Sequence, residues 1–221
     1  MSAYPQIAIL VRWVLYWLSK LILRFWIGVK VKGCEKLKLP SENQFVLIAN
    51  HNSHLDTAAL LTLFPFQELK LIKPVAAADY FMGSAFMRWF SSTVLNILPI
   101  ERIEVSRSNN PIAQMSEALE GGYSLILFPE GSRGNPEELA SLQPGIAHLI
   151  RRFPSIIYQI VFMHGLGRSL PKGERVILPF FAELIISEPI HFEGTKAEIL
   201  SKLDATMILL ASQCHYPVNP D

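Results

Sequence analysis

A histidine and an aspartate in residues 50–56 (NHNSHLD) are the side chains of this sequence best suited to chemistry. His51 and Asp56 are five residues apart. Histidine can take a proton from a hydroxyl group near neutral pH. A nearby carboxylate can hold the imidazole in the required tautomer and stabilise the imidazolium, as in the serine-protease triad. The pair would let the hydroxyl of a substrate, in place of an enzyme serine, attack a carbonyl directly, so that no covalent enzyme intermediate is needed.

The spacing predicts that the two side chains come from different local structures. Two residues five apart on one ideal helix point about 140° away from each other. We therefore expect His51 in the turn before a helix and Asp56 in its first turn, with Ser53 as the N-cap. The same pattern resembles a capping box. From this segment alone, a helix-capping Asp56 and an ordinary loop histidine remain an open alternative.

A metal site is a weaker interpretation of the same segment. The histidines and Asp56 resemble a metal-hydrolase HxHxDH pattern, but aligning His54 and Asp56 places Asn52 and Thr57 where two further histidines are needed. The sequence contains no other histidine-rich cluster that would supply a ligand set. We expect no metal.

A second polar cluster occupies residues 128–134 (FPEGSRG). Its glycines let the backbone approach a ligand closely, and its arginine offers a bidentate fork for phosphate. The serine and the backbone N–H groups can also donate to phosphate, and the glutamate would hold the arginine or bind a substrate hydroxyl. A surface turn with a solvated arginine is the alternative. Together with an arginine that follows another short strand, the candidate substrate-binding residues are Arg102, Glu130, Gly131, Ser132 and Arg133.

Short apolar runs alternate with helical patterns along the chain, which predicts an α/β fold with a mostly parallel sheet flanked by helices. Both polar clusters directly follow predicted strands, and sites in such sheets gather at the C-terminal ends of strands. The expected strands cover residues 28–32, 45–49, 69–76, 97–100, 124–128, 156–162 and 176–186. The expected helices cover residues 57–63, 80–95, 111–119, 146–152 and 195–212.

The N-terminal residues 6–28 form an apolar stretch that contains Arg12, Lys20 and Arg24. These charges disfavour a spanning helix, and no small-residue cleavage site follows to indicate a signal peptide. At about 100° per residue the three cations lie within one third of the helix circumference, opposite a broad aliphatic face. This arrangement favours a helix at the membrane interface, and a helix packed on the protein's own core is the alternative. We divide the chain into a membrane-associating helix (1–28) and one domain (29–221).

The composition argues against several classes of binding partner. Half of the 221 residues are hydrophobic, 18% are charged and the mean hydropathy is +0.28, which is apolar for a soluble protein of this size. A net charge of +1 argues against nucleic-acid binding. The two cysteines, Cys34 and Cys214, lack CxxC spacing and indicate neither a metal nor a redox site. The oligomeric state stays open.

The two clusters in this order resemble the glycerolipid acyltransferase family, whose best-known members are lysophosphatidate acyltransferases. Asn50, His51 and Asp56 match its NHxxxxD motif, residues 128–134 resemble its FPEGTRS-like motif, and residues 100–102 (IER) resemble its second motif. The resemblance implies an O-acyltransferase of phospholipid biosynthesis that transfers a fatty acyl chain from acyl-CoA or acyl carrier protein to a lysophospholipid hydroxyl, without metal or cofactor. It implies His51 as general base and Asp56 as its partner. It also implies acceptor binding by Arg102, Glu130, Gly131 and Arg133.

The sequence leaves open both the lipid that accepts the acyl chain and the functional class of the protein. The family's fourth motif contains a proline, whereas residues 156–162 (IIYQIVF) contain none and include Gln159. The acceptor could therefore be lysophosphatidate or another lysophospholipid. A non-catalytic lipid-binding protein of the same fold is the first alternative. A hydrolase is the second, although the sequence has no GxSxG elbow. The use of cytosolic thioesters leads us to expect the cytoplasmic face of the inner or plasma membrane.

Overall fold

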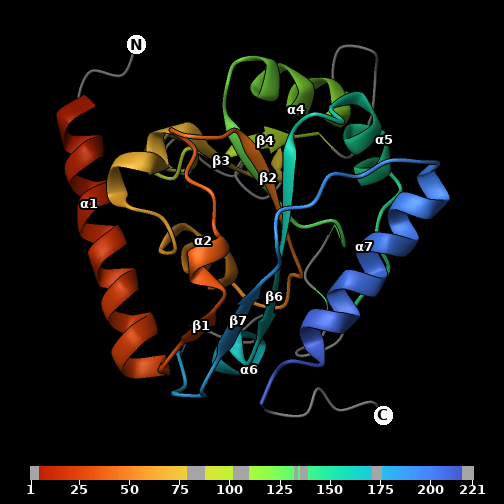
Figure 1. Ribbon diagram of the computed structural model, residues 1–221. Coiled ribbons are helices and arrows are strands. Elements are labelled where there is room, and N and C mark those ends of the chain that lie inside the picture. Colours follow the sequence, from red (N-terminus) through yellow and green to blue (C-terminus); the bar gives the residue numbers. More distant parts are fainter. Residues whose placement is uncertain are drawn as a thin grey trace.

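The computed structural model describes residues 5–78, 88–101, 110–131, 134, 139–170 and 176–215. These residues build one seven-stranded sheet, covered by helices on both faces (Figure 1). Its strands are β1 (Lys30–Lys32), β2 (Phe45–Ala49), β3 (Ile72–Ala77), β4 (Leu98–Ile100), β5 (Ser124–Leu127), β6 (Ile157–His164) and β7 (Glu183–Ile186). The α-helices are α1 (Pro5–Leu21), α2 (Asp56–Leu61), α4 (Pro111–Glu120), α5 (Gly145–Arg152), α6 (Leu166–Ser169) and α7 (Lys196–Ala211). Short 3-10 segments, η2 (Cys34–Lys36) and η3 (Phe66–Leu71), and π-helical segments, η1 (Ile22–Ile27) and η5 (Phe90–Val94), complete the described elements.

The sheet is mostly parallel, as the sequence predicts. Its strand order is β1-β7-β6-β2-β5-β3-β4, and the five strands from β6 to β4 all run the same way. Strand β7 pairs with β6 in antiparallel orientation, and β1 pairs with β7 in parallel orientation. Ile48 of β2 lies between Leu127 of β5 and Ile160 of β6. The C-terminal ends of β2 and β5 are therefore neighbours, and both polar clusters begin there.

Strand β2 lies inside the sheet and is covered on both faces, which accounts for its continuous apolar sequence. Its residues are all buried. Val46 and Ile48 pack on one face with the apolar sides of α4, α5 and α7. Phe45 and Leu47 pack on the other face with α1, η1 and α2. A parallel strand covered on both faces must be apolar at every position, so no alternation appears in its sequence.

The predicted strand over residues 176–186 is wrong in its first part. Only Glu183–Ile186 pairs with β6. Before it, the N–H of Leu178 donates to the carbonyl of Ser169, and that of Phe180 donates to Leu178, so the segment turns instead of extending along the sheet. Pro179 has no N–H for a strand ladder. The expected helix over 80–95 is seen at residues 88–94, and residues 79–87 lie outside the described part.

The polar side of helix α1 faces the rest of the protein and not the solvent. The Arg12 guanidinium donates to the carbonyls of Thr93 and Val94, each at 2.6 Å, and burial lowers the pKa of Arg12. The Tyr16 hydroxyl donates to the carbonyl of Phe64 at 2.9 Å and accepts from Lys20 Nζ at 3.0 Å. The opposite face of α1 and of the η1 segment after it leaves large apolar side chains exposed: Ile9, Leu10, Trp13, Val14, Trp17, Leu18, Leu21, Phe25 and Trp26.

This amphipathic arrangement fits membrane association. The helical stretch Gln6–Ile27 is 22 residues long, and its length and mean hydropathy of 1.5 would suffice to cross a membrane. The buried core helix of a soluble protein can have the same length and composition. The exposed apolar face distinguishes this helix from a core helix and agrees with an interfacial position.

Gln159, the residue that departs from the family pattern, has a structural role. Its side chain is fully buried, Oε1 accepts from the N–H of Lys38 at 3.0 Å, and Nε2 donates to the carbonyl of Lys36 at 2.9 Å. It thereby ties the segment after η2 to the middle of β6.

We expect Gln159→Met to lower the free energy of unfolding by about 1–3 kcal/mol, because two backbone groups lose their partners. Denaturant unfolding would measure this difference. The same substitution at exposed Gln213 is the control and should change stability by less than about 0.5 kcal/mol. Equal effects at both positions would contradict the assigned role.

Candidate active site

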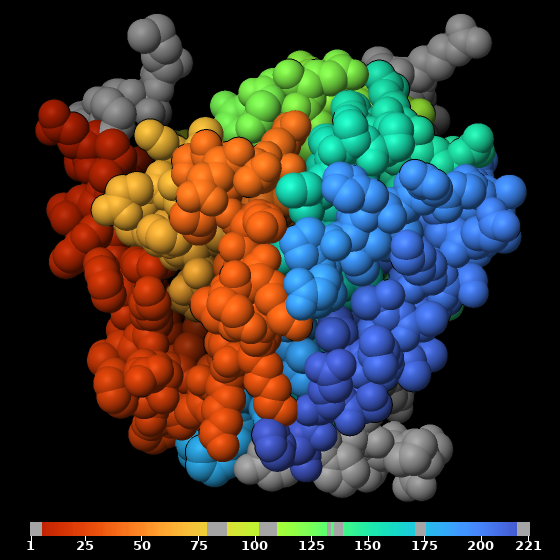
Figure 2. Space-filling model, viewed as in Figure 1, coloured from red at the N-terminus to blue at the C-terminus, as the bar shows by residue number. Residues whose placement is uncertain are grey.

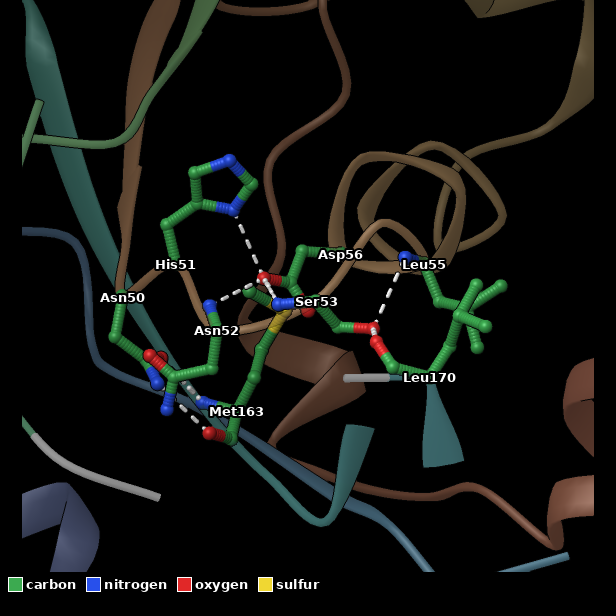
Figure 3. Close-up of polar contacts among 8 residues, drawn as sticks. All are labelled: Asn50, His51, Asn52, Ser53, Leu55, Asp56, Met163 and Leu170. Carbon is green, nitrogen blue, oxygen red and sulfur yellow. Dashed lines mark hydrogen bonds and ion pairs between the residues drawn. The ribbon is translucent and has the colours of Figure 1, made fainter. Parts of the chain in front are cut away.

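Asn50 fixes the start of the loop that carries His51 against the neighbouring strand. Its side chain donates to the carbonyl of Met163 at 2.8 Å and accepts from the N–H of the same residue at 2.7 Å (Figure 3). These two bonds continue the β2–β6 ladder by one residue after the β2 backbone has turned away. His51 therefore leaves the sheet at a defined point.

His51 and Asp56 form a hydrogen-bonded side-chain pair in the candidate site. His51 Nδ1 lies 2.9 Å from Asp56 Oδ2, and the same oxygen accepts from the N–H groups of Asn52 at 2.7 Å and Ser53 at 2.8 Å (Figure 3). The Asp56 side chain is 1% exposed and the His51 side chain 21%. The carboxylate is thus fixed inside the loop, while the imidazole reaches the surface.

The structure confirms the predicted positions of the pair and corrects the predicted cap. Asp56 is the first residue of α2, and His51 lies in the turn before it. Ser53 is not the N-cap: this position belongs to Leu55, which makes no side-chain cap. The Ser53 hydroxyl instead accepts from the N–H of Leu55 at 3.2 Å and donates to the carbonyl of Leu170 at 3.0 Å. Asp56 Oδ2 accepts from the N–H of Ser53 at 2.8 Å, as one half of a capping box would, but the Ser53 hydroxyl accepts from Leu55 and not from Asp56, so the reciprocal bond is not formed.

The second cluster lies against His51. The N–H of Gly134 donates to the carbonyl of His51 at 2.9 Å. The ring of Phe128 stacks on the imidazole with centroids 4.1 Å apart and an interplanar angle of 21°. Gly131 has a φ of +81°, which favours glycine, and a Cβ there would lie 3.2 Å from Gln143 Cγ. Two motifs about 75 residues apart therefore form one site.

The described part of the chain includes two of the five predicted substrate-binding residues. Glu130 and Gly131 adjoin the His51 loop, whereas Arg102, Ser132 and Arg133 lie outside the described residues. The sequence interpretation missed the stacking role of Phe128 and the anchoring role of Ser53. Phe128 carried a usable signal, since it is the last apolar residue before the glycine turn. Across the described ranges, no group of three or more His, Cys, Asp or Glu side chains is arranged to hold a metal.

Glu130 is a buried carboxyl group beside the pair. The residue is 5% exposed, and burial, reinforced by the charge of Asp56, raises the pKa of Glu130 to about 8. The backbone N–H groups of His51 and Ala140 oppose this rise. Glu130 is therefore mostly protonated at neutral pH, and its neutral form can donate a hydrogen bond to an incoming oxygen.

The raised pKa predicts a pH-dependent stability. The folded protein holds the Glu130 proton between about pH 4.5 and pH 8 and the unfolded chain does not, so stability should fall as pH rises through this window. We expect Glu130→Gln to remove this fall. Thermal unfolding of both proteins from acidic to alkaline pH would measure it, and identical profiles would contradict the assignment.

The sequence of this chain is similar to those of known acyltransferases. Residues 28–163 match the family model named Acyltransferase. The chain is 29% identical over 185 residues to the chloroplastic 1-acyl-sn-glycerol-3-phosphate acyltransferase of Arabidopsis thaliana, covering 83% of this chain and 49% of that protein. It is 24% identical over 187 residues to the alpha form of the same enzyme from Bos taurus, covering 82% and 61%. This chain thus spans about half the length of the plant relative.

A solved structure shows the same fold. The crystal structure of the 1-acyl-sn-glycerophosphate (LPA) acyltransferase PlsC from Thermotoga maritima superimposes with a TM-score of 0.73 at 19% identity, covering 98% of this chain and 85% of that one. At this identity the likeness concerns the fold alone. The matched family model covers more than half of the sequence and includes the His51 loop and the glycine turn. The chain belongs to the Acyltransferase family.

Proposed function

We propose that this protein is a membrane-associated O-acyltransferase that moves a fatty acyl chain from an acyl thioester to the hydroxyl of a lysophospholipid. The observation that carries the proposal is the hydrogen-bonded His51–Asp56 pair at the end of β2, beside the glycine turn of the second motif. Family membership supports the reaction class. Neither a metal nor a bound cofactor is part of the proposal.

The pair suggests a direct transfer. The Asp56 carboxylate accepts a hydrogen bond from the N–H at Nδ1 of His51. Nε2, on the far side of the imidazole, is therefore the base (Figure 3). Nε2 takes the acceptor's hydroxyl proton as the oxygen attacks the thioester carbonyl. The new C–O bond forms, the C–S bond breaks, and the imidazolium returns the proton to the leaving thiolate. The products are an ester and a free thiol.

Lysophosphatidate is the acceptor that we favour. The matched plant and bovine relatives are named 1-acyl-sn-glycerol-3-phosphate acyltransferases. The second motif also supplies residue types that bind phosphate, including Arg133. The acyl donor is acyl-CoA or acyl carrier protein, both of which present the same thioester.

A substrate panel tests the proposal. The full-length protein in mixed micelles is given radiolabelled acyl-CoA or acyl carrier protein with lysophosphatidate, lysophosphatidylcholine or lysophosphatidylethanolamine. We expect labelled phosphatidate as the main product. Release of labelled free fatty acid without any acylated lipid would indicate a hydrolase. Lipid binding without turnover of either donor would indicate a non-catalytic protein.

We also propose that the exposed face of α1 binds the cytoplasmic face of the inner or plasma membrane. The apolar outer surface of the helix supports the membrane contact. The choice of face follows from the donor, because acyl thioesters of coenzyme A and carrier protein are cytosolic.

A further inference from the structure

Residues 176–181 (VILPFF) expose more apolar surface than a loop in water normally does. The exposed fractions are 67% for Val176, 44% for Leu178, 46% for Phe180 and 63% for Phe181. Single exposed apolar side chains are common on protein surfaces, but a contiguous group indicates an interaction site. This group lies outside the candidate active site.

The segment is held in place by its backbone. Leu178 N–H donates to the Ser169 carbonyl at 2.8 Å, the Ser169 hydroxyl donates to the Phe180 carbonyl at 3.1 Å, and Lys30 N–H donates to the Ala182 carbonyl at 2.9 Å. Because these backbone groups already have protein partners, the segment can leave water without a large cost in unpaired polar groups. Its apolar side chains face outward while its polar groups face the protein.

The segment adjoins the C-terminal end of the N-terminal helix. Trp26 Nε1 donates to the carbonyl of Ile177 at 3.0 Å, and a Cβ on Gly28 would lie 2.8 Å from the ring of Phe181. Phe25 and Trp26 are themselves 76% and 57% exposed. Both segments meet at the bottom of the molecule in Figure 1, and Figure 2 shows their atoms side by side there. We call residues 176–181 together with the exposed face of α1 and η1 the docking patch.

The chemistry around the docking patch fits an anionic lipid surface. Exposed cations adjoin it: Arg24 precedes Phe25, Lys30 is bonded to Ala182, and Arg168 precedes Ser169. The first 34 residues of the sequence contain no acidic residue. Aromatic side chains next to cations are typical of segments that sit at the headgroup level. A protein partner would not require this one-sided charge.

We propose that residues 176–181 are a second membrane-inserting element, which enters the same leaflet as the exposed face of α1 and η1. This inference rests on the proposed membrane-bound function and extends it to a part of the chain far from the N-terminus. Helix α1 packs on the protein through Arg12 and Tyr16, so it lies along the bilayer surface with the docking patch instead of crossing the bilayer.

Insertion of this element would set the position of the active site. Ser169, which binds the backbone of residues 178 and 180, is followed by Leu170, whose carbonyl accepts from the Ser53 hydroxyl at 3.0 Å. The backbone N–H of Ser53 in turn donates to the Asp56 carboxylate, which is paired with His51. A short series of hydrogen bonds therefore joins residues 176–181 to the His51 loop.

Vesicle binding tests the inference. The double variant Phe180→Ser, Phe181→Ser is compared with the unsubstituted full-length protein on sedimented phosphatidylcholine–phosphatidylglycerol vesicles. We expect the partition coefficient to fall by at least about tenfold, since two large apolar side chains no longer leave water. The matched control is Ile208→Ser, Leu209→Ser, a pair that is 62% and 59% exposed on α7, the helix that covers the face of the sheet opposite to α1 (Figure 1). It should bind as the unsubstituted protein does.

Unchanged binding of the Phe180, Phe181 variant, or an equal loss with the α7 control, would overturn the inference. If the double variant does not fold, Phe180→Cys can be labelled with an environment-sensitive fluorophore after Cys34 and Cys214 are replaced by serine. A blue shift on vesicles supports insertion, and an unshifted spectrum overturns it. His51→Ala should bind vesicles normally. Normal vesicle binding by a protein that shows no acyl transfer would refute the proposed function alone.

Discussion

Replacing His51 by alanine is expected to lower kcat for acyl transfer by about 10²–10⁴-fold, the usual contribution of a general base. The variant keeps the Asp56 bonds to the N–H groups of Asn52 and Ser53, so the loop retains two of the three bonds that shape it. The change should appear in kcat with little effect on KM, because the imidazole acts on the reacting proton. Initial rates with labelled acyl-CoA and lysophosphatidate in mixed micelles measure it.

The control for this prediction is His148→Ala. His148 is an exposed histidine on α5, so its replacement removes the same side chain without touching the loop. It should transfer acyl chains at the normal rate. If His51→Ala were as active as His148→Ala, the proposed mechanism would be wrong.

The second large effect is expected for Asp56→Asn. In this variant the imidazole loses the carboxylate that holds its Nδ1 proton, and the equivalent change in the serine-protease triad costs about 10⁴-fold in kcat. The loop should also loosen. Oδ2 accepts three hydrogen bonds, and an amide nitrogen placed there would oppose the N–H groups of Asn52 and Ser53.

Two measurements separate these effects. The pH profile of kcat should change shape if Asp56 supports the base, whereas a purely structural role would lower the thermal midpoint and leave the profile unchanged. Asp204→Asn, an exposed position on α7, is the control for the substitution itself. Normal kcat in the Asp56 variant would mean that His51 needs no carboxylate partner.

The sequence predicted the sheet because its strands are continuous apolar runs. Residues 45–49 match β2, and residues 124–128 end one residue beyond β5. It placed Asp56 at the start of a helix because five-residue spacing excludes a shared helical face. The strand prediction failed for residues 176–182, because an apolar run has the same composition whether it faces a protein core or a lipid surface. Only the tertiary contacts of Ser169 and Trp26 distinguish the two.

Two further features depend on contacts between residues that are far apart in the sequence. Ser53 was predicted as an N-cap because serine followed by an acidic residue three positions later satisfies that motif. Its hydroxyl instead binds Leu170, 117 residues away, which no local pattern can show. The inward orientation of Arg12 depends in the same way on the carbonyls of Thr93 and Val94. Long-range backbone acceptors override short sequence motifs at both positions.

The contacts of helix α1 have a consequence for biosynthesis. Tyr16 must wait for Phe64, 48 residues later, and Arg12 for Val94, 82 residues later. At translation rates of about 5–20 residues per second, the helix spends several seconds without its protein partners. During that time its apolar face can already meet a bilayer. The order of synthesis therefore favours a ribosome-bound chain that reaches the membrane first and completes its sheet against a helix already in place.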